Sequence, residues 1–238
     1  MIDPAGRVVM ISGANRGIGA AIARRLHALG YSLSLGARDP ASLAPLTASI
    51  EAARVMVHEY EALDETHPAR WVAATVARFG RLDALVNNAG LLHPVSIETG
   101  SEAELDLMWD VNARAPFRMI RAAWPHLRQA GNGRIVNIAS ITGLRVKSAE
   151  ATGYAMSKFA TVALTHGVRQ EGWPYGIRAA ALCPGFVATD MTDGWTDFPR
   201  DAMVDAEAVA ETAALLIALP NNASVAAIAL NCQPEAAW

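Results

Sequence analysis

Short apolar runs alternate with helix-like stretches along most of the chain. The first run, residues 7–12, is rich in β-branched side chains and is typical of a buried strand. Comparable runs occur at residues 31–36, 54–58, 82–87, 133–139, 177–183 and 225–231. Strands that alternate with helices form βαβ units, which need a mostly parallel sheet with helices on both faces. The pattern therefore predicts one α/β domain over residues 1–238, doubly wound around a seven-stranded sheet, since no repeat, low-complexity tract or linker interrupts it.

Two local signals refine this outline. Asp39 followed by Pro40 combines a helix N-cap with proline at the first helical position, so a helix is expected to begin there. Residues 190–206 mix acids, Gly194, Pro199 and two aromatic side chains, and they form the least regular segment. Because long irregular segments inside compact domains are often lids or binding loops, this segment is a candidate for one.

The composition narrows the class of protein. With 238 residues, 52% of them apolar and 18% charged, the chain suits one globular domain with a sizeable core. The net charge of −3 and the scattered basic residues offer no surface for a polyanion, so nucleic acid is not an expected partner. No apolar run reaches the roughly 18 residues that cross a bilayer, so no membrane partner is expected either.

The N-terminus and the cysteines favour the cytoplasm. The first residues show no basic segment followed by an apolar core, so no secretory signal is expected. Cys183 and Cys232 fit a reducing compartment. Cys183 falls in an apolar run and is expected to be an inert core thiol.

A glycine-rich turn follows the first predicted strand. Gly13, Gly17 and Gly19 stand in the string SGANRGIG, and a helix-like stretch continues to Gly30. Glycines allow a tight turn and a close approach of the backbone, and a helix N-terminus offers unpaired N–H groups to a pyrophosphate. Strand, turn and helix together favour dinucleotide binding. The alternative is an ordinary loop whose glycines only turn the chain.

A phenol and an ammonium lie one helical turn apart. Tyr154 and Lys158 are four residues apart in the sequence, which places both on one helix face. A phenol titrates near about pH 10, and a fixed cation beside it moves its pKa toward neutrality. The pair is therefore a candidate general acid/base. The alternative is a solvated helix face.

Taken together, these features resemble the short-chain dehydrogenase/reductase family. The elements that carry the resemblance extend from about residue 7 to residue 231: G-x-x-x-G-x-G from Gly13 to Gly19, Asn87-Asn88-Ala89-Gly90, Asn112, Ser140, Tyr154-x-x-x-Lys158 and Pro184-Gly185. The resemblance implies a Rossmann-type fold, a nicotinamide cofactor, and the interconversion of a carbonyl group and an alcohol.

The resemblance also implies a catalytic set. Tyr154 is expected to donate the proton in reduction and to accept it in oxidation. Lys158 is expected to lower the pKa of that phenol and to bind the nicotinamide ribose. Ser140 is expected to hydrogen-bond the substrate oxygen, and Asn112 to hold a water that links Lys158 to solvent. The alternatives are a routine turn serine and an asparagine that kinks a helix or lies at the surface.

The end of the second predicted strand decides which cofactor is bound. A carboxylate there accepts hydrogen bonds from the ribose 2′-hydroxyl, and in the family it stands where this chain has Ala37. Arg38 comes next, and Arg16 projects from the glycine-rich turn. Two guanidiniums without a carboxylate make a clamp for a 2′-phosphate, so NADP(H) is expected. Asp39 is interpreted as the helix cap, and two solvated arginines are the alternative.

Other cofactor contacts follow from the resemblance. Glu61 stands where the family usually has Asp near the adenine, and Asn88 would lie beside the adenosine ribose. The segment from Pro184 to Thr189 would pack on the nicotinamide. The full expected set is Gly13, Asn15, Arg16, Gly17, Ile18, Gly19, Arg38, Glu61, Ala62, Asn88, Ala89, Gly90, Tyr154, Lys158, Pro184, Gly185, Val187 and Thr189. No metal is expected.

The substrate is expected to be a small carbonyl compound or alcohol. Its candidate contacts are Ser140, Leu144, Tyr154, Met191, Trp195 and Phe198. The resemblance implies a homodimer built on the long helices over residues 109–128 and 154–171, or a homotetramer that also uses the C-terminal strand. The C-terminal sequence SVAAIALNCQPEAAW lacks the usual family pattern for the second arrangement. Two other functions stay open: a non-catalytic NADP(H)-binding redox sensor, and an NAD(H)-dependent alcohol dehydrogenase of the same family.

Overall fold

One parallel sheet forms the centre of the molecule. The computed structural model describes residues 1–193 and 198–234. Within them, seven strands pair in the order β3-β2-β1-β4-β5-β6-β7, and every pairing is parallel. The strands are β1 (Val8–Ser12), β2 (Ser32–Ala37), β3 (Val55–Glu59), β4 (Ala84–Asn87), β5 (Arg134–Ile138), β6 (Arg178–Pro184) and β7 (Ala227–Leu230). This architecture confirms the predicted α/β fold, and each strand lies on one of the seven apolar runs.

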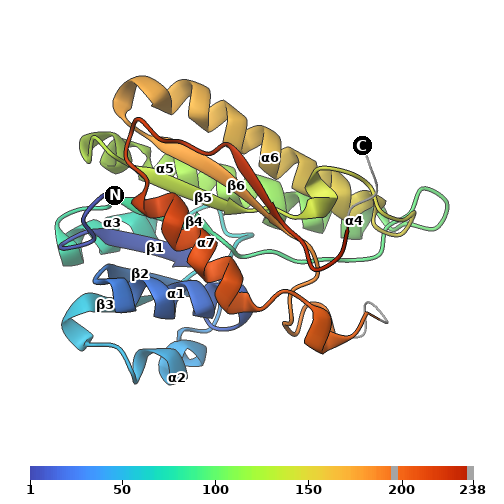
Figure 1. Ribbon diagram of the computed structural model, residues 1–238, viewed down its shortest axis with the longest axis horizontal. Helices are drawn as coiled ribbons and strands as arrows, with labels where there is room; N and C mark the ends of the chain where they lie inside the picture. Colours follow the sequence, from blue (N-terminus) through green and yellow to red (C-terminus); the bar gives the residue numbers. More distant parts are fainter. Residues whose placement is uncertain (194–197, 235–238) are drawn as a thin grey trace.

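Helices cover both faces of the sheet. They are α1 (Gly17–Leu29), α2 (Ala44–Thr47), α3 (His67–Phe79), α4 (Glu102–Trp109), α5 (Ala115–Gln129), α6 (Thr152–Gly172) and α7 (Ala206–Ala218). Short 3-10 helices are η1 (Pro40–Leu43), η2 (Ala52–Arg54), η4 (Ile141–Gly143), η5 (Trp173–Tyr175) and η6 (Arg200–Ala202), and η3 (Asp110–Arg114) is a π-helix. Helices α1 and α7 pack on one face of the sheet, and α3, α5 and α6 pack on the other (Figure 1).

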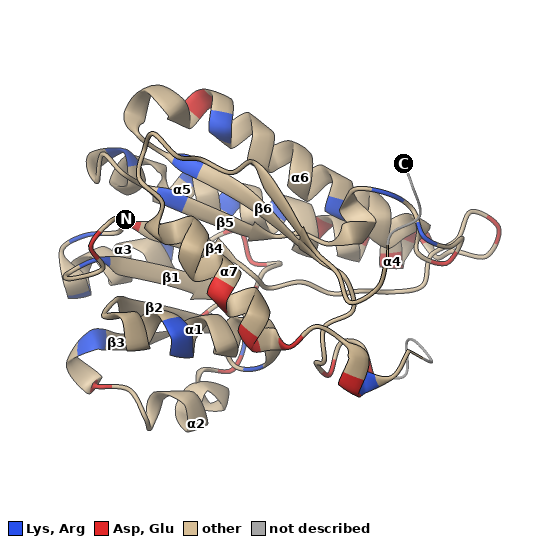
Figure 2. Cartoon of the chain, viewed as in Figure 1, with Lys and Arg blue, Asp and Glu red and all other residues tan. Residues whose placement is uncertain are grey.

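Each face of the sheet has its own buried cluster. Leu33 and Leu35 of β2 belong to the cluster under α1 and α7, whereas Met10 and Leu85 belong to the cluster under α3 and α5. All four side chains are fully buried. A strand that is covered on both faces is apolar along nearly its whole length. This is why the apolar runs in the sequence predicted the strands. At the rim of the first layer, basic residues of α1 pair with acidic residues of α7 (Figure 2).

The expected helix start after the second strand is present. The Asp39 carboxylate accepts a hydrogen bond of 2.9 Å from the backbone N–H of Ala41, and Pro40 is the first residue of η1. The cap therefore begins a 3-10 turn that leads into α2. Its carboxylate is engaged by the turn, which supports the interpretation of Asp39 as a cap.

A single π-helical turn joins α4 and α5. Asn112 lies in this turn, between Asp110 and Arg114. The prediction of a helix around Asn112 is confirmed, but its π-helical form was not foreseen. Such turns carry an extra residue relative to an α-helix and are frequent at functional sites.

A network of charged side chains closes the edge of the sheet where the strands begin. Asp83 is fully buried and accepts hydrogen bonds from Arg81 and from the backbone N–H of Val8. Arg7 lies 3.6 Å from the same carboxylate. A buried carboxylate needs this many donors, because desolvation of an unpaired charge is costly.

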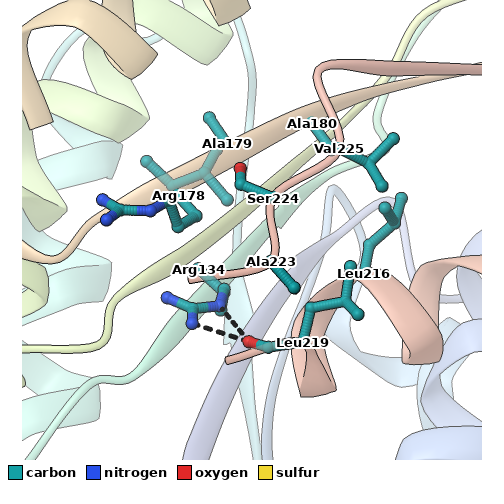
Figure 3. A pocket seen from close by; sticks show the side chains of 10 residues that line it. Arg134, Arg178, Ala179, Ala180, Leu216, Leu219, Ala223, Ser224 and Val225 are labelled. Carbon is teal, nitrogen blue, oxygen red and sulfur yellow. Dashed lines mark hydrogen bonds between the residues drawn. The ribbon is translucent and has the colours of Figure 1, made fainter. Parts of the chain in front are cut away.

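Arg134 fastens the same edge to the segment that follows α7. Its guanidinium donates two hydrogen bonds to the Leu219 carbonyl oxygen (Figure 3). It donates another to the Asn221 side chain. Burial lowers the pKa of Arg134 to about 10. The adjoining cavity, which Arg178 also lines, has a volume of only about 10 Å³, so this edge is a structural anchor with room for about one water.

Candidate active site

A large cleft opens at the opposite edge, where the strands end. The sheet order places β1 between β2 and β4, so the chain reverses its direction of winding there. In parallel sheets of this kind, ligands bind outside the carboxyl ends of the strands at such a switch point. The cleft has a volume of about 980 Å³. It is the place where the sequence-predicted residues meet.

The cleft brings together nearly the whole predicted cofactor set. Of the predicted residues, those that line it are Gly13, Asn15, Arg16, Gly17, Ile18, Arg38, Glu61, Ala62, Asn88, Ala89, Gly90, Tyr154, Lys158, Pro184, Gly185, Val187 and Thr189. Gly19 does not line it. A Cβ on Gly19 would lie 2.2 Å from the Gly13 carbonyl oxygen, so this glycine lets α1 pack against the turn.

The glycine-rich turn is tight and is braced from β4. Gly13 has φ +63°, and a Cβ there would lie 3.0 Å from the Ala89 Cα atom. The Asn88 amide donates hydrogen bonds of 3.0 and 2.9 Å to the carbonyl oxygens of Ser12 and Gly13. Asn88 therefore holds the turn in addition to lining the cleft.

The N-terminus of α1 opens into the cleft. Its N-cap residue is Arg16, which makes no side-chain capping bond, and the first turn contains no acidic residue. The first N–H groups of a helix carry a partial positive charge and lack partners within the helix. A cleft of this volume with an uncapped helix start beside three glycines fits the pyrophosphate of a dinucleotide.

The predicted selectivity residues lie on one wall of the cleft. Ala37 is the last residue of β2, and Arg38 follows it as an exposed side chain. Arg16 forms an ion pair of 2.9 Å with Asp190, a residue from the segment after β6. The Glu61 carboxylate accepts a hydrogen bond from the backbone N–H of Leu63, so it is partly used by its own loop.

Tyr154 and Lys158 meet at the floor of the cleft. Both belong to α6, and their exposed fractions are 8% and 5%. The Lys158 Nζ atom donates a hydrogen bond of 3.0 Å to the Ile138 carbonyl oxygen at the end of β5. It lies 5.6 Å from the centroid of the Tyr154 ring. The predicted pair therefore faces the cleft instead of solvent.

Burial dominates the pKa of the Tyr154 phenol. Burial raises the pKa of Tyr154 to about 12, and its hydrogen bond with Ser140 opposes part of that rise. Burial likewise lowers the pKa of Lys158 to about 8. Without the cofactor, desolvation therefore outweighs the hydrogen bond with Ser140. The expected lowering of the phenol pKa by Lys158 together with the bound oxidised cofactor stays a prediction.

Ser140 lies where β5 meets the 3-10 turn η4. Its hydroxyl accepts a hydrogen bond of 3.1 Å from the Thr142 N–H and donates one of 3.4 Å to the Pro184 carbonyl oxygen. The hydroxyl also bonds to Tyr154. Ser140 therefore stabilises a turn, which was the alternative role, and its hydroxyl also lies beside the Tyr154 phenol.

Asn112 stands behind the cleft wall. Its amide accepts from the Leu91 N–H and donates to the Leu91 carbonyl oxygen, at 2.9 and 2.8 Å. It also donates to the Ser157 hydroxyl at 3.0 Å, and Thr161 donates to its backbone carbonyl oxygen at 2.8 Å. The side chain fixes the loop after β4 against α6, and the proposed water relay stays a prediction.

The substrate end of the cleft agrees only in part with the predicted residues. Met191 lines the cleft, but Leu144 packs on a separate apolar cluster with Ala181 and Cys183. The Phe198 ring stacks on Phe186 with centroids 5.8 Å apart and does not line the cleft. Trp195 lies outside the described residues.

One lining residue, Phe186, was missed as a substrate contact. Phe186 follows the predicted Gly185 directly, and its neighbours could have indicated it. The Lys147 ammonium lies 5.1 Å from the centroid of the Phe186 ring, so a cation and an aromatic face adjoin in this wall.

Cys183 is buried below the site, and burial raises the pKa of its thiol to about 11, as an inert core thiol requires.

Across residues 1–193 and 198–234, no helix has both the length and the apolar character needed to cross a membrane. In the same ranges, no group of three or more His, Cys, Asp or Glu side chains is placed to hold a metal ion.

Comparison with known proteins gives consistent matches. Residues 7–199 match the family model described as short chain dehydrogenase. The chain is 40% identical to agropine synthesis reductase of Rhizobium rhizogenes, over 96% of this chain and 53% of that protein. It therefore spans about half the length of this relative. It is 37% identical to 3-alpha-(or 20-beta)-hydroxysteroid dehydrogenase of Mycobacterium bovis, over 92% of this chain and 84% of that protein.

Solved structures agree with the fold. An alcohol dehydrogenase from the archaeon Thermococcus sibiricus, complexed with 5-hydroxy-NADP, superposes with a TM-score of 0.86 at 30% identity. The alignment covers 97% of this chain and 99% of that one. A metagenomic short-chain oxidoreductase in complex with NADP gives a TM-score of 0.82 at 29% identity, with coverages of 96% and 98%.

Proposed function

The chain belongs to the short-chain dehydrogenase family, whose members use nicotinamide cofactors, and from that premise we propose that it is an NADP(H)-dependent oxidoreductase that interconverts a carbonyl compound and an alcohol. One observation carries the proposal. Tyr154, Lys158 and Ser140 line the same cleft as the uncapped N-terminus of α1. A candidate proton donor and a helix start suited to a pyrophosphate therefore share one cleft.

The Tyr154 phenol can act as the proton donor in reduction. A phenol with a pKa of about 12 is protonated at neutral pH, as a proton donor must be. In reduction, the Tyr154 hydroxyl delivers its proton to the carbonyl oxygen, and the Ser140 hydroxyl donates a hydrogen bond to the same oxygen. The Lys158 ammonium then stabilises the phenolate. The nicotinamide, when bound, supplies the hydride.

The preference for NADP(H) rests on charge at the end of β2. The Ala37 side chain offers no acceptor to a ribose hydroxyl, and Arg16 and Arg38 both line the cleft nearby. Guanidiniums bind phosphate with two parallel hydrogen bonds, which an uncharged hydroxyl cannot match. The two structural relatives with NADP-type ligands support this choice.

The substrate is proposed to be a small carbonyl compound, held between Ser140, Tyr154, Met191 and the Phe186 ring. The names of the relatives include a reductase and a hydroxysteroid dehydrogenase, which agrees with carbonyl and alcohol chemistry. The two free cysteines agree with the proposed cytoplasmic location.

We also propose a homo-oligomer. Large apolar side chains are exposed on the helices that were expected to pair: Trp109, Phe117, Met156 and Phe159. Exposed apolar side chains that gather on neighbouring helices favour association with a second copy.

The decisive experiment is Tyr154→Phe, assayed by nicotinamide absorbance against a panel of carbonyls and alcohols. General acid/base catalysis contributes typically about 10²–10⁴-fold, so turnover should fall by that factor while NADPH binding persists. Tyr175→Phe is the matched control, because Tyr175 lies at the surface on Arg128, a contact that Phe keeps. Unchanged turnover in Tyr154→Phe would refute the role, and wild-type protein that binds NADPH without turnover would favour the redox sensor.

A further inference from the structure

Arg16 and Asp190 form an ion pair at the cleft, although they are 174 residues apart in the sequence. Their side chains meet at 2.9 Å, and both remain mostly exposed, at 64% and 61%. Arg16 belongs to the glycine-rich turn, and Asp190 to the segment after β6. Both residues line the cleft. The pair therefore connects two separate parts of the cleft wall.

The carboxylate is presented by an anchored backbone. The Thr192 hydroxyl donates to the carbonyl oxygens of Val187 and Thr189, at 2.7 and 2.8 Å. The Ala188 N–H donates to the Val204 carbonyl oxygen at 3.0 Å. The same segment touches the glycine-rich turn, because a Cβ on Gly17 would lie 3.1 Å from the Thr189 Cγ2 atom. Asp190 is thus held within reach of Arg16.

The two arginines of the proposed clamp differ in their partners. Arg16 has a carboxylate on its guanidinium, whereas Arg38 forms no ion pair with any residue in the described part of the chain. A carboxylate at hydrogen-bond distance offsets the positive charge of Arg16. A phosphate that binds the same Nη1 group of Arg16 would have to displace this carboxylate. Arg38 is therefore the readily available cation, whereas the Nη1 group of Arg16 is engaged by Asp190.

We propose that Asp190 is a specificity-determining residue that competes with the cofactor 2′-phosphate for Arg16 and so reduces the preference for NADP(H) over NAD(H). The inference rests on the proposed NADP(H) function. NAD(H) has no 2′-phosphate and need not separate the pair, so the competition acts on one cofactor. A general repulsion between Asp190 and the pyrophosphate acts on both cofactors and cancels in the ratio of their affinities.

The expected effect is small and measurable. Exposed ion pairs contribute up to about 1 kcal/mol, which corresponds to about fivefold in an equilibrium constant. Asp190→Asn should therefore raise the ratio of the NADH dissociation constant to the NADPH dissociation constant by about two- to fivefold. The increase should shrink at high ionic strength, because salt screens exposed charges.

The experiment is a double-mutant cycle on cofactor binding, measured by nucleotide fluorescence or calorimetry without substrate. The proteins are wild type, Asp190→Asn, Arg16→Ala and the double variant. In the Arg16→Ala background, Asp190→Asn should leave the affinity ratio unchanged. Asp193→Asn is the matched control, since Asp193 also lines the cleft but pairs with Arg200. This control should leave the ratio unchanged.

Each outcome tests a different part of the proposal. If Arg16→Ala keeps the full preference for NADPH, the proposed clamp at Arg16 is wrong, and the inference fails with it. If Arg16→Ala lowers the preference but Asp190→Asn leaves it unchanged or lowers it, the competition is wrong while the proposed function stands. An equal increase in Asp193→Asn would show a general charge effect and would also overturn the competition.

Discussion

Lys158 should lower the free energy of unfolding, although the proposed catalysis needs it. Its ammonium is nearly buried, and burial lowers its pKa from 10.5 to about 8. Each pKa unit corresponds to about 1.36 kcal/mol, so the charged side chain opposes folding by about 3 kcal/mol at neutral pH. The variant Lys158→Met removes this penalty and keeps most of the side-chain volume.

An opposing effect reduces the gain. Lys158→Met also removes the hydrogen bond to the Ile138 carbonyl oxygen, and an unsatisfied buried carbonyl costs about 1–3 kcal/mol. At pH 7, Lys158→Met should therefore be as stable as wild type or more stable by up to about 2 kcal/mol, while its turnover collapses. Such an exchange between stability and activity is common at active sites.

The pH dependence separates the two effects. Between pH 8 and 10.5 the unfolded state holds the Lys158 proton more often than the folded state does, so the free energy of unfolding of wild type rises with pH relative to Lys158→Met. The penalty should shrink by about 2 kcal/mol from pH 7 to about 9.5. The loss of the hydrogen bond has no such dependence.

Urea unfolding of both proteins at several pH values in this range measures the difference. Tyr154 and Cys183 have raised pKa values, which lowers stability at high pH. Lys158 lowers the pKa of Cys183 in wild type, but in both folded proteins the Cys183 thiol and the Tyr154 phenol stay mostly protonated up to about pH 9.5, so their contributions nearly cancel below that pH. Lys147→Met removes an exposed ammonium and controls for the loss of one positive charge. A difference between wild type and Lys158→Met that stays constant with pH would refute the desolvation argument.

Three other predictions test separate parts of the molecule. Gly19→Ala places a Cβ 2.2 Å from the Gly13 carbonyl oxygen, so it should abolish NADPH binding in a fluorescence titration and lower the melting temperature. Asp83→Ala leaves Arg7 buried without its carboxylate and should reduce the free energy of unfolding by about 3–5 kcal/mol in urea, whereas no loss would show that the network contributes little. Phe159→Glu should lower the molar mass seen by light scattering, and an unchanged mass would place the interface elsewhere.

The strands and the glycine-rich turn could be predicted because their causes are local. A parallel strand that is buried on both faces must be apolar almost throughout, and a turn such as that at Gly13 excludes a Cβ. The spacing of Tyr154 and Lys158 likewise follows from helix geometry. These features need no knowledge of the rest of the fold.

The features that could not be predicted depend on distant contacts. The pKa of Tyr154 follows from the closure of the cleft around it, which no short segment specifies. The Arg16–Asp190 pair joins residues 174 positions apart. Leu144 was expected in the substrate pocket because it follows the fifth strand, but the turn η4 directs it to another apolar cluster. In each case tertiary packing decides the outcome.

The π-helical turn at Asp110–Arg114 has a consequence for how this region tolerates change. Successive residues of an α-helix are rotated by about 100°, so one surplus residue resets the angular phase between α4 and α5. Removing any one residue there would restore a regular helix and swing α4 around its axis relative to α5. Asn112 could then no longer hold Leu91, and a single-residue deletion should damage this part of the molecule more than most substitutions.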